Sequence, residues 1–114
     1  MEAIVRQGRE CDPRTLLAQI GAMNFLAISG GRFEVIYALD DEDGYGPYPI
    51  GVRLPVAQSR SVEVTLDWSD TYRVRRVRKV TQGAQRGSEV IEAEQTDVYF
   101  DEVGEVAYTL SCWK

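Results

Sequence analysis

Residues 61–80 read SVEVTLDWSDTYRVRRVRKV, and this stretch decides the fold. Val62, Val64 and Leu66 alternate with polar residues, which is typical of a strand that buries one face. Residues 68–70 (WSD) favour a turn, and a second strand over 71–80 returns from it. The stretch therefore predicts two successive antiparallel strands.

The returning strand has an irregular apolar spacing. Val74 and Val77 lie three residues apart, so a regular strand would place them on opposite faces. A β-bulge near Arg75 and Arg76 would let both valines point inward. We therefore expect a bulge within this strand.

Upstream of residue 61, the pattern predicts one helix and three further strands. Asp12-Pro13 is a favourable helix start, and it predicts a helix over 13–21. Aromatic and β-branched residues predict strands over 25–29, 33–39 and 51–56, the first two joined by a tight turn at Gly30-Gly31.

The segment that follows residue 95 fits two patterns. Apolar residues at helical spacing predict a helix over 96–108, whereas alternation over 106–112 would suit a strand. Gly104 weakens the helical interpretation, because glycine costs about 1 kcal/mol relative to alanine inside a helix. We favour the helix.

Together these elements predict an α+β fold over a single domain, residues 1–114. An antiparallel sheet of about four to five strands carries a short N-terminal helix and a C-terminal helix. Residues 1–12 are expected to form a loose or strand-like lead-in. Residues 40–49 (DDEDGYGPYP) are expected to form an inserted acidic loop.

The chain separates its charges along the sequence. The net charge is −5, yet residues 71–80 hold five bases and no acid. Residues 89–105 hold seven acids and no base. Such a distribution indicates separate basic and acidic faces, which can steer a charged partner or pair with further copies of the chain.

The chain lacks the residues that several classes of catalytic and metal site require. The chain has no histidine, which removes Ser–His–Asp and Cys–His catalysis and HExxH zinc sites. Cys11 and Cys112 are expected to be free thiols, because cytosolic disulfides are rare. The acidic loop fails the EF-hand pattern, since Leu39 and Ile50 stand where acids are needed, although a looser carboxylate site for calcium or magnesium remains an alternative. We expect no cofactor, no metal, no membrane span and no signal peptide, and hence a cytoplasmic protein.

Four stretches carry a family resemblance: LLAQIGAMNFLAISGG (16–31), GVRLPV (51–56), SVEVTLDWSDTYRVRRVRKV (61–80) and TDVYFDEVGEVAYTLSCW (96–113). Their order resembles that of a family of short, uncharacterised proteins from bacteriophages and integrated mobile elements. The acidic loop and the arginine-rich strand depart from the family pattern. The resemblance implies a phage-like origin and an α+β fold with a helical C-terminal segment. It implies no catalytic residues.

The basic strand is the main candidate site. Its bases could contact phosphates, with Tyr72 and Trp68 available for stacking; these bases are Arg73, Arg75, Arg76, Arg78 and Lys79. Alternatively they form the solvent face of an edge strand, pair with the acids of 89–105, or meet an acidic protein partner. Trp68, in its turn, would suit a binding anchor.

These observations favour a non-enzymatic accessory protein of phage type in the bacterial host cytoplasm. We expect it to act as a protein-interaction module, which is either host-directed or self-associating. The alternative is a nucleic-acid-binding accessory protein that uses the strand over 71–80.

Overall fold

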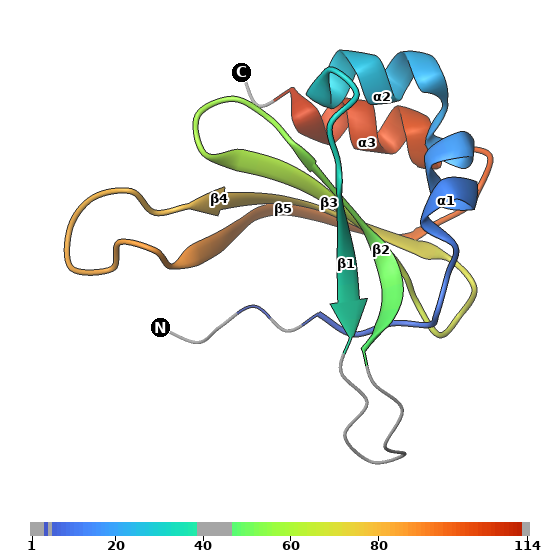
Figure 1. Cartoon of the computed structure of the whole chain (residues 1–114), viewed down its shortest axis with the longest axis horizontal. Coiled ribbons are helices and arrows are strands. Elements are labelled where there is room, and N and C mark those ends of the chain that lie inside the picture. Colours follow the sequence, from blue (N-terminus) through green and yellow to red (C-terminus); the bar gives the residue numbers. More distant parts are fainter. Residues whose placement is uncertain (1–3, 5, 39–46, 113–114) are drawn as a thin grey trace.

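Three helices cover one face of a five-stranded antiparallel sheet in the computed structural model, which describes residues 4, 6–38 and 47–112 (Figure 1). The helices are α1 (Pro13–Ile20), α2 (Ala22–Ser29) and α3 (Val103–Ser111). The strands are β1 (Glu34–Ala38), β2 (Tyr48–Pro55), β3 (Arg60–Leu66), β4 (Tyr72–Lys79) and β5 (Glu89–Val98). Each strand pairs with its neighbours in chain order, so the α+β class and the antiparallel sheet are confirmed. Of the acidic loop predicted over 40–49, residues 40–46 lie outside the described residues, and its end is wrong because Tyr48 and Pro49 belong to β2.

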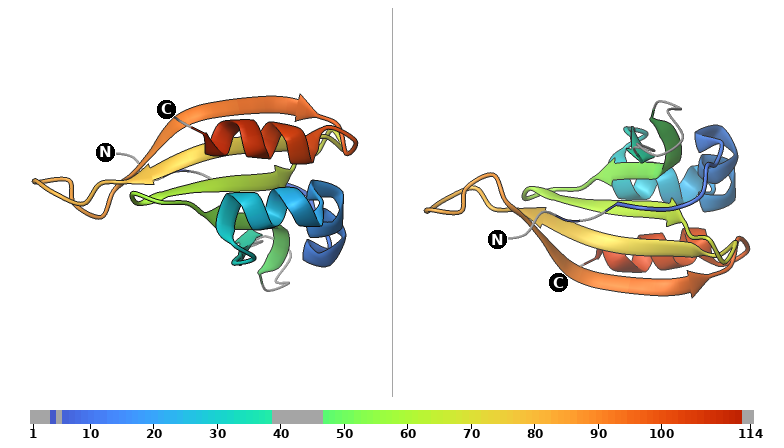
Figure 2. Two further views of the ribbon diagram at one scale, coloured as in Figure 1. Left: turned by 90° about the horizontal axis from the view of Figure 1, so that it is seen from above. Right: turned by 90° about the horizontal axis from the view of Figure 1, so that it is seen from below.

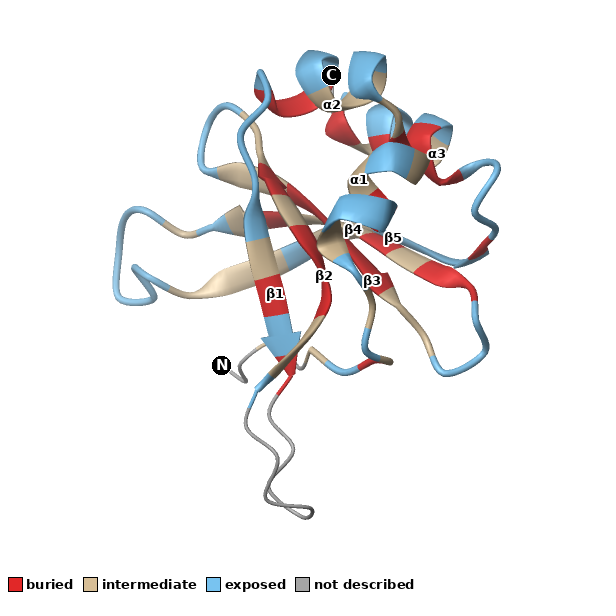
Figure 3. Ribbon diagram, turned by 45° about the vertical axis from the view of Figure 1, so that its right-hand side comes forward, coloured by how far each residue is buried: buried red, intermediate tan, exposed pale blue. Residues whose placement is uncertain are grey.

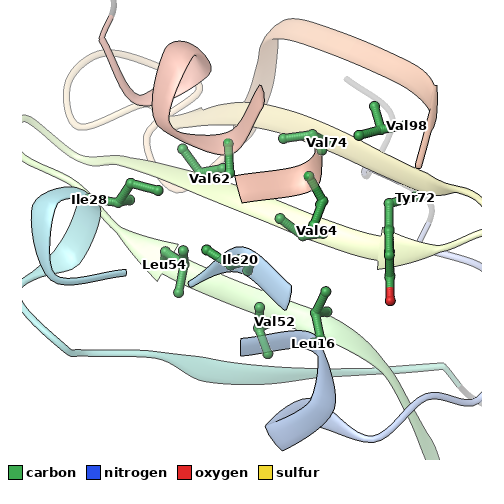
Figure 4. Close-up of a cluster of buried hydrophobic side chains, with 12 residues drawn as sticks. Leu16, Ile20, Ile28, Val52, Leu54, Val62, Val64, Tyr72, Val74 and Val98 are labelled. Atoms are coloured by element: carbon green, nitrogen blue, oxygen red, sulfur yellow. The ribbon is translucent and has the colours of Figure 1, made fainter. Parts of the chain in front are cut away.

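The core lies between the helices and one face of the sheet. Alternate residues of the central strands face it, including Val52, Val62, Val64 and Val74, which are all fully buried (Figure 4). Leu16 and Ile20 of α1, together with Val103 and Ala107 of α3, close it from the helical side. Apolar residues that alternate along the strands thus pack against apolar residues at helical spacing in α1 and α3.

The first helix forms where the sequence predicts it. The Asp12 side chain accepts a hydrogen bond from the backbone N–H of Arg14 at 2.9 Å, and Pro13 occupies the first helical position. The helix ends at Gly21, whose φ of 94° is a conformation that other residues rarely adopt.

The strand predicted over 25–29 is wrong, because these residues belong to α2. A short apolar run does not distinguish a buried strand from a buried helix, and this run is only eight residues long. Gly30 is left-handed, with φ 66°, and its N–H donates to the carbonyl of Leu26 at 2.9 Å. The glycine therefore ends a helix instead of turning a hairpin.

The C-terminal helix is confirmed, but it begins at Val103 and not at residue 96. Residues 89–98 form β5, which the sequence did not predict as a strand. Gly104 has a packing role there, because a Cβ on it would stand 2.1 Å from the carbonyl oxygen of Ile20. The glycine lets α3 approach the end of α1.

The bulge predicted within the strand over 71–80 is wrong, because the irregularity near Arg75 and Arg76 lies in the neighbouring strand β5. The β3–β4 register runs without a break, so Val74 and Val77 are both buried on opposite faces. The β4–β5 register shifts between Arg76 and Val77, which pair with residues 93 and 91. Glu92 is therefore the extra residue, and it lies in β5.

The second face of the sheet is crossed by the N-terminal segment (Figure 2). The Arg9 N–H donates to the Leu66 carbonyl at 2.8 Å, and the Cys11 N–H donates to the Pro49 carbonyl at 2.9 Å. Gly8 is buried there, and a Cβ on it would stand 2.3 Å from the Leu66 oxygen. The lead-in predicted as loose or strand-like is thus fixed to the sheet by these contacts over its described part.

Candidate interaction surfaces

The basic strand β4 is an inner strand, between β3 and β5. Its side chains alternate between the two faces, so Arg76 and Arg78 lie on the helical face and Arg73 and Arg75 on the other. The arginines that the sequence places together are therefore divided by the sheet itself. They do not form one continuous basic surface.

On the helical face, Glu92 collects three arginines. Arg60 donates to it through Nε at 2.7 Å, Arg76 through Nε at 3.1 Å and Arg78 through Nε at 3.0 Å. Arg76 also donates to the Leu110 carbonyl at the end of α3, at 3.2 Å. The hydrogen bond from Arg60, with smaller contributions from Arg76 and Arg78, lowers the pKa of Glu92.

On the opposite face, Glu63 is the centre of a second cluster. Its side chain is only 1% exposed, and Arg6 binds it with both Nε and Nη2 at 2.8 Å. Arg53 donates to the same carboxylate at 3.2 Å. Arg6 also reaches Glu89 at 3.0 Å. Hydrogen bonding to Glu63 raises the pKa of Arg6, so this cation stays charged.

The two remaining arginines of β4 have acidic neighbours as well. Arg75 bonds Glu94 on β5, and the Nε of Arg73 lies 3.6 Å from a carboxylate oxygen of Asp67. Lys79 stands opposite Glu89 in the register and is exposed. The acids of 89–94 thus meet the bases of β4 across neighbouring strands, which leaves fewer guanidinium donors for phosphates.

The two aromatic candidates of the predicted site are far from equivalent. Tyr72 is buried in the core, where its hydroxyl donates to the Gln19 side chain and burial raises its pKa. Trp68 is 70% exposed in the β3–β4 turn. Of these two residues, only Trp68 is exposed to solvent.

Two further aromatic residues, which the sequence analysis missed, lie at the same end of the sheet. Tyr99 is 60% exposed and Phe100 is 66% exposed in the connection between β5 and α3. The signal was an aromatic pair followed by two acids, as in a turn, but the predicted helix over 96–108 absorbed it. The structure makes it a loop that follows an edge strand.

Register places this loop beside Trp68. Leu66 pairs with Tyr72 and Tyr72 pairs with Val98, so three chain segments reach this end in adjacent positions. Figure 3 shows both connections in the colour of exposed residues, to the same side of the sheet. We call these two connections, which carry Trp68, Tyr99 and Phe100, the aromatic loops.

A second apolar surface lies on α2. Met23 and Leu26 are exposed on one side of this helix, and Phe33 follows the turn after it. The ring of Phe33 packs edge-on against Phe25, with the centroids 5.9 Å apart. This surface is apolar, and α2 itself contains no charged residue.

Nothing in the described part of the chain forms a cluster of three or more metal-binding side chains. None of the helices described there is long and apolar enough to cross a membrane. An open hollow is lined by Glu10, Cys11, Asp12, Pro13 and Pro49. Burial raises the pKa of the Cys11 thiol to about 11, so at neutral pH it is protonated and a poor nucleophile.

Comparison with known proteins gives no relative: no family model, no curated protein and no solved structure matches the chain. The resemblance to short phage proteins therefore stays a prediction.

Proposed function

We propose that this chain is a non-enzymatic protein-interaction module whose partner docks on the aromatic loops. The observation that carries the proposal is the exposure of Trp68, Tyr99 and Phe100 in neighbouring loops at one end of the sheet. Large exposed apolar side chains that gather on one surface mark interaction sites. Tryptophan and tyrosine are also enriched among the residues that dominate binding energy.

The fold supports this proposal by holding the loops in place. Tyr72 follows the β3–β4 turn and Val98 precedes the β5–α3 loop. Both residues are buried, and they pair across neighbouring strands. The Glu102 side chain accepts a hydrogen bond from the Tyr99 N–H at 3.0 Å and so closes the second loop. A preformed surface loses little conformational entropy when it binds.

The resemblance to phage proteins supports the wider setting of the proposal. We place the protein as a phage-type accessory factor in the cytoplasm of a bacterial host, where it acts by covering a surface. Nucleic-acid binding through β4 is the less favoured alternative, because the arginines of that strand are divided between two faces and form ion pairs with acids.

Capture from a bacterial lysate tests the proposal. The tagged wild type is compared with a loop variant (Trp68→Ser with Phe100→Ser) and with a control variant on α2 (Met23→Ser with Leu26→Ser), which removes two equally exposed apolar residues. If the partner is a host protein, the wild type and the control should retain it, and the loop variant should lose it by about tenfold or more. Equal capture by the loop variant would overturn the proposal.

A titration with labelled DNA at low salt tests the alternative. Micromolar binding that weakens steeply with salt would favour the nucleic-acid function instead. We expect no such binding, because the guanidinium groups of β4 already hold carboxylates.

A further inference from the structure

The end that bears the aromatic loops is acidic. Asp97, Asp101 and Glu102 are exposed in or beside the β5–α3 loop. Asp67 and Asp70 flank Trp68, and these two face Arg73 and Arg9. The three exposed aromatic rings are therefore rimmed by carboxylates.

The opposite end of the sheet is basic. The β4–β5 connection there carries Arg86, and the strand ends beside it carry Lys79, Arg78 and Arg60. Lys79 and Arg86 are exposed, whereas Arg60 and Arg78 share Glu92. Figure 1 shows this connection and the aromatic loops at opposite ends of the longest axis.

We propose that the partner of the aromatic loops is the basic end of a second copy of this chain, docked head to tail. This inference rests on the proposed function and names its occupant. A guanidinium or ammonium group is attracted to the face of an aromatic ring as well as to carboxylates. Arg86 and Lys79 of one copy therefore suit the acid-rimmed aromatic loops of the next.

The dimensions of the molecule allow the two ends to act separately. The longest axis is 38 Å, whereas the Debye length is about 10 Å at 0.1 M salt. Under those conditions the acidic end interacts with the basic end that faces it and is screened from its own basic end. The net charge of −5, which would repel copies at long range, is screened as well.

A head-to-tail contact joins two different surfaces, so it does not close at a dimer. Light scattering at about 0.1 M salt should therefore give a mass that rises steadily with concentration from 12.8 kDa. At about 1 M salt, where the Debye length is about 3 Å, the mass should return to that of the monomer.

Two neutralised variants test the contact itself. The first variant replaces two side chains of the acidic end (Trp68→Ser with Asp101→Asn). The second replaces two side chains of the basic end (Lys79→Gln with Arg86→Gln). All four positions are exposed, and circular dichroism checks that each variant is folded. Each variant alone should stay monomeric, because each lacks one of the two surfaces.

An equimolar mixture of the two variants should form a heterodimer of about twice the monomer mass and nothing larger. Only one intact pair of ends is present in that mixture, which is a signature of head-to-tail contact. A mixture that stays monomeric would overturn the inference, and so would a wild-type dimer of fixed mass that persists in high salt. A monomeric wild type that still captures a lysate protein through Trp68 would overturn the second copy as occupant and leave the proposed function standing.

Discussion

Replacing Glu63 by glutamine should destabilise the fold more than any other single charge removal in the sheet. Glu63 is 1% exposed, and it holds Arg6 at 2.8 Å and Arg53 at 3.2 Å. Glutamine has the same shape, but its amide nitrogen would face guanidinium donors that need an acceptor. The change removes the buried anion that Arg6 and Arg53 share, and leaves these two cations only the more exposed carboxylates of Glu89 and Glu34.

The expected magnitude follows from the burial of the three groups. Removing one partner of a buried ion pair costs about 3–5 kcal/mol. Arg6 and Arg53 are 19% and 31% exposed, so water partly solvates the charges that remain, and the lower end of that range applies. We expect a loss of about 3 kcal/mol in the free energy of unfolding, which lowers Tm by about 12 °C for a domain of this size.

Urea denaturation measures the loss, with Glu94→Gln as the matched control. Glu94 pairs with Arg75 one strand away but is more exposed, so its removal should cost at most about 1 kcal/mol. An unchanged slope with urea shows that both variants unfold from the same compact state. The argument fails if Glu63→Gln lies within about 1 kcal/mol of the wild type, or if the control costs as much.

A double variant separates the share of the N-terminal segment. In an Arg6→Met background, the cost of Glu63→Gln should fall, because one of the two cations is no longer present. Equal costs in both backgrounds would show that Arg6 does not depend on Glu63. The N-terminal segment would then be held by its backbone hydrogen bonds alone.

Three further changes have definite signs. Ser59→Gly should raise the free energy of unfolding by about 1 kcal/mol in urea denaturation, because Ser59 has a φ of 63° in the β2–β3 turn; an unchanged midpoint would contradict this. Gly104→Ala should lower Tm, although helix propensity alone predicts a gain of about 1 kcal/mol, because its Cβ would stand 2.1 Å from the Ile20 oxygen; a raised Tm would refute the packing argument. The pKa of Glu92 is lowered from 4.5, so its stabilisation is complete above that pH and is lost as the pH falls through the folded value. Stability measured from neutral to acidic pH should therefore fall less steeply in Glu92→Gln, and parallel curves would contradict this.

The sequence predicted those parts of the fold in which the local pattern and the tertiary environment agree. Strand β3 carries a clear alternation, the turn after it fixes the direction of β4, and α1 carries its own cap. It failed at α2, where an apolar run suits either type of element. It failed at β5 because the two irregularities of that strand, including Asp97 with φ 57°, break the period of two.

The candidate site was harder to predict than the fold, because the strand order decides which charged residues face each other. The sequence shows a basic segment and an acidic segment, and two such segments form separate faces only if the fold keeps them apart. The antiparallel order places β4 beside β5, so Glu92 and Glu94 meet Arg76 and Arg75 directly. Most of the sequence-level charge separation is thereby converted into ion pairs.

What remains of the separation lies along the strands and not across the sheet. The ion pairs between β4 and β5 use residues 75–78 and 92–94, where the two segments overlap. The acids after Val98 then collect beside Trp68, and the bases near Arg86 collect at the opposite end. Both ends are built from connections between the same antiparallel strands, so a partner that recognises one of them meets an exposed surface in which one sign of charge predominates. Of the described residues, Trp68, Tyr99 and Phe100 gather at the acidic end, and that asymmetry is why the acidic end, and not the arginine strand, is the surface from which binding should be tested.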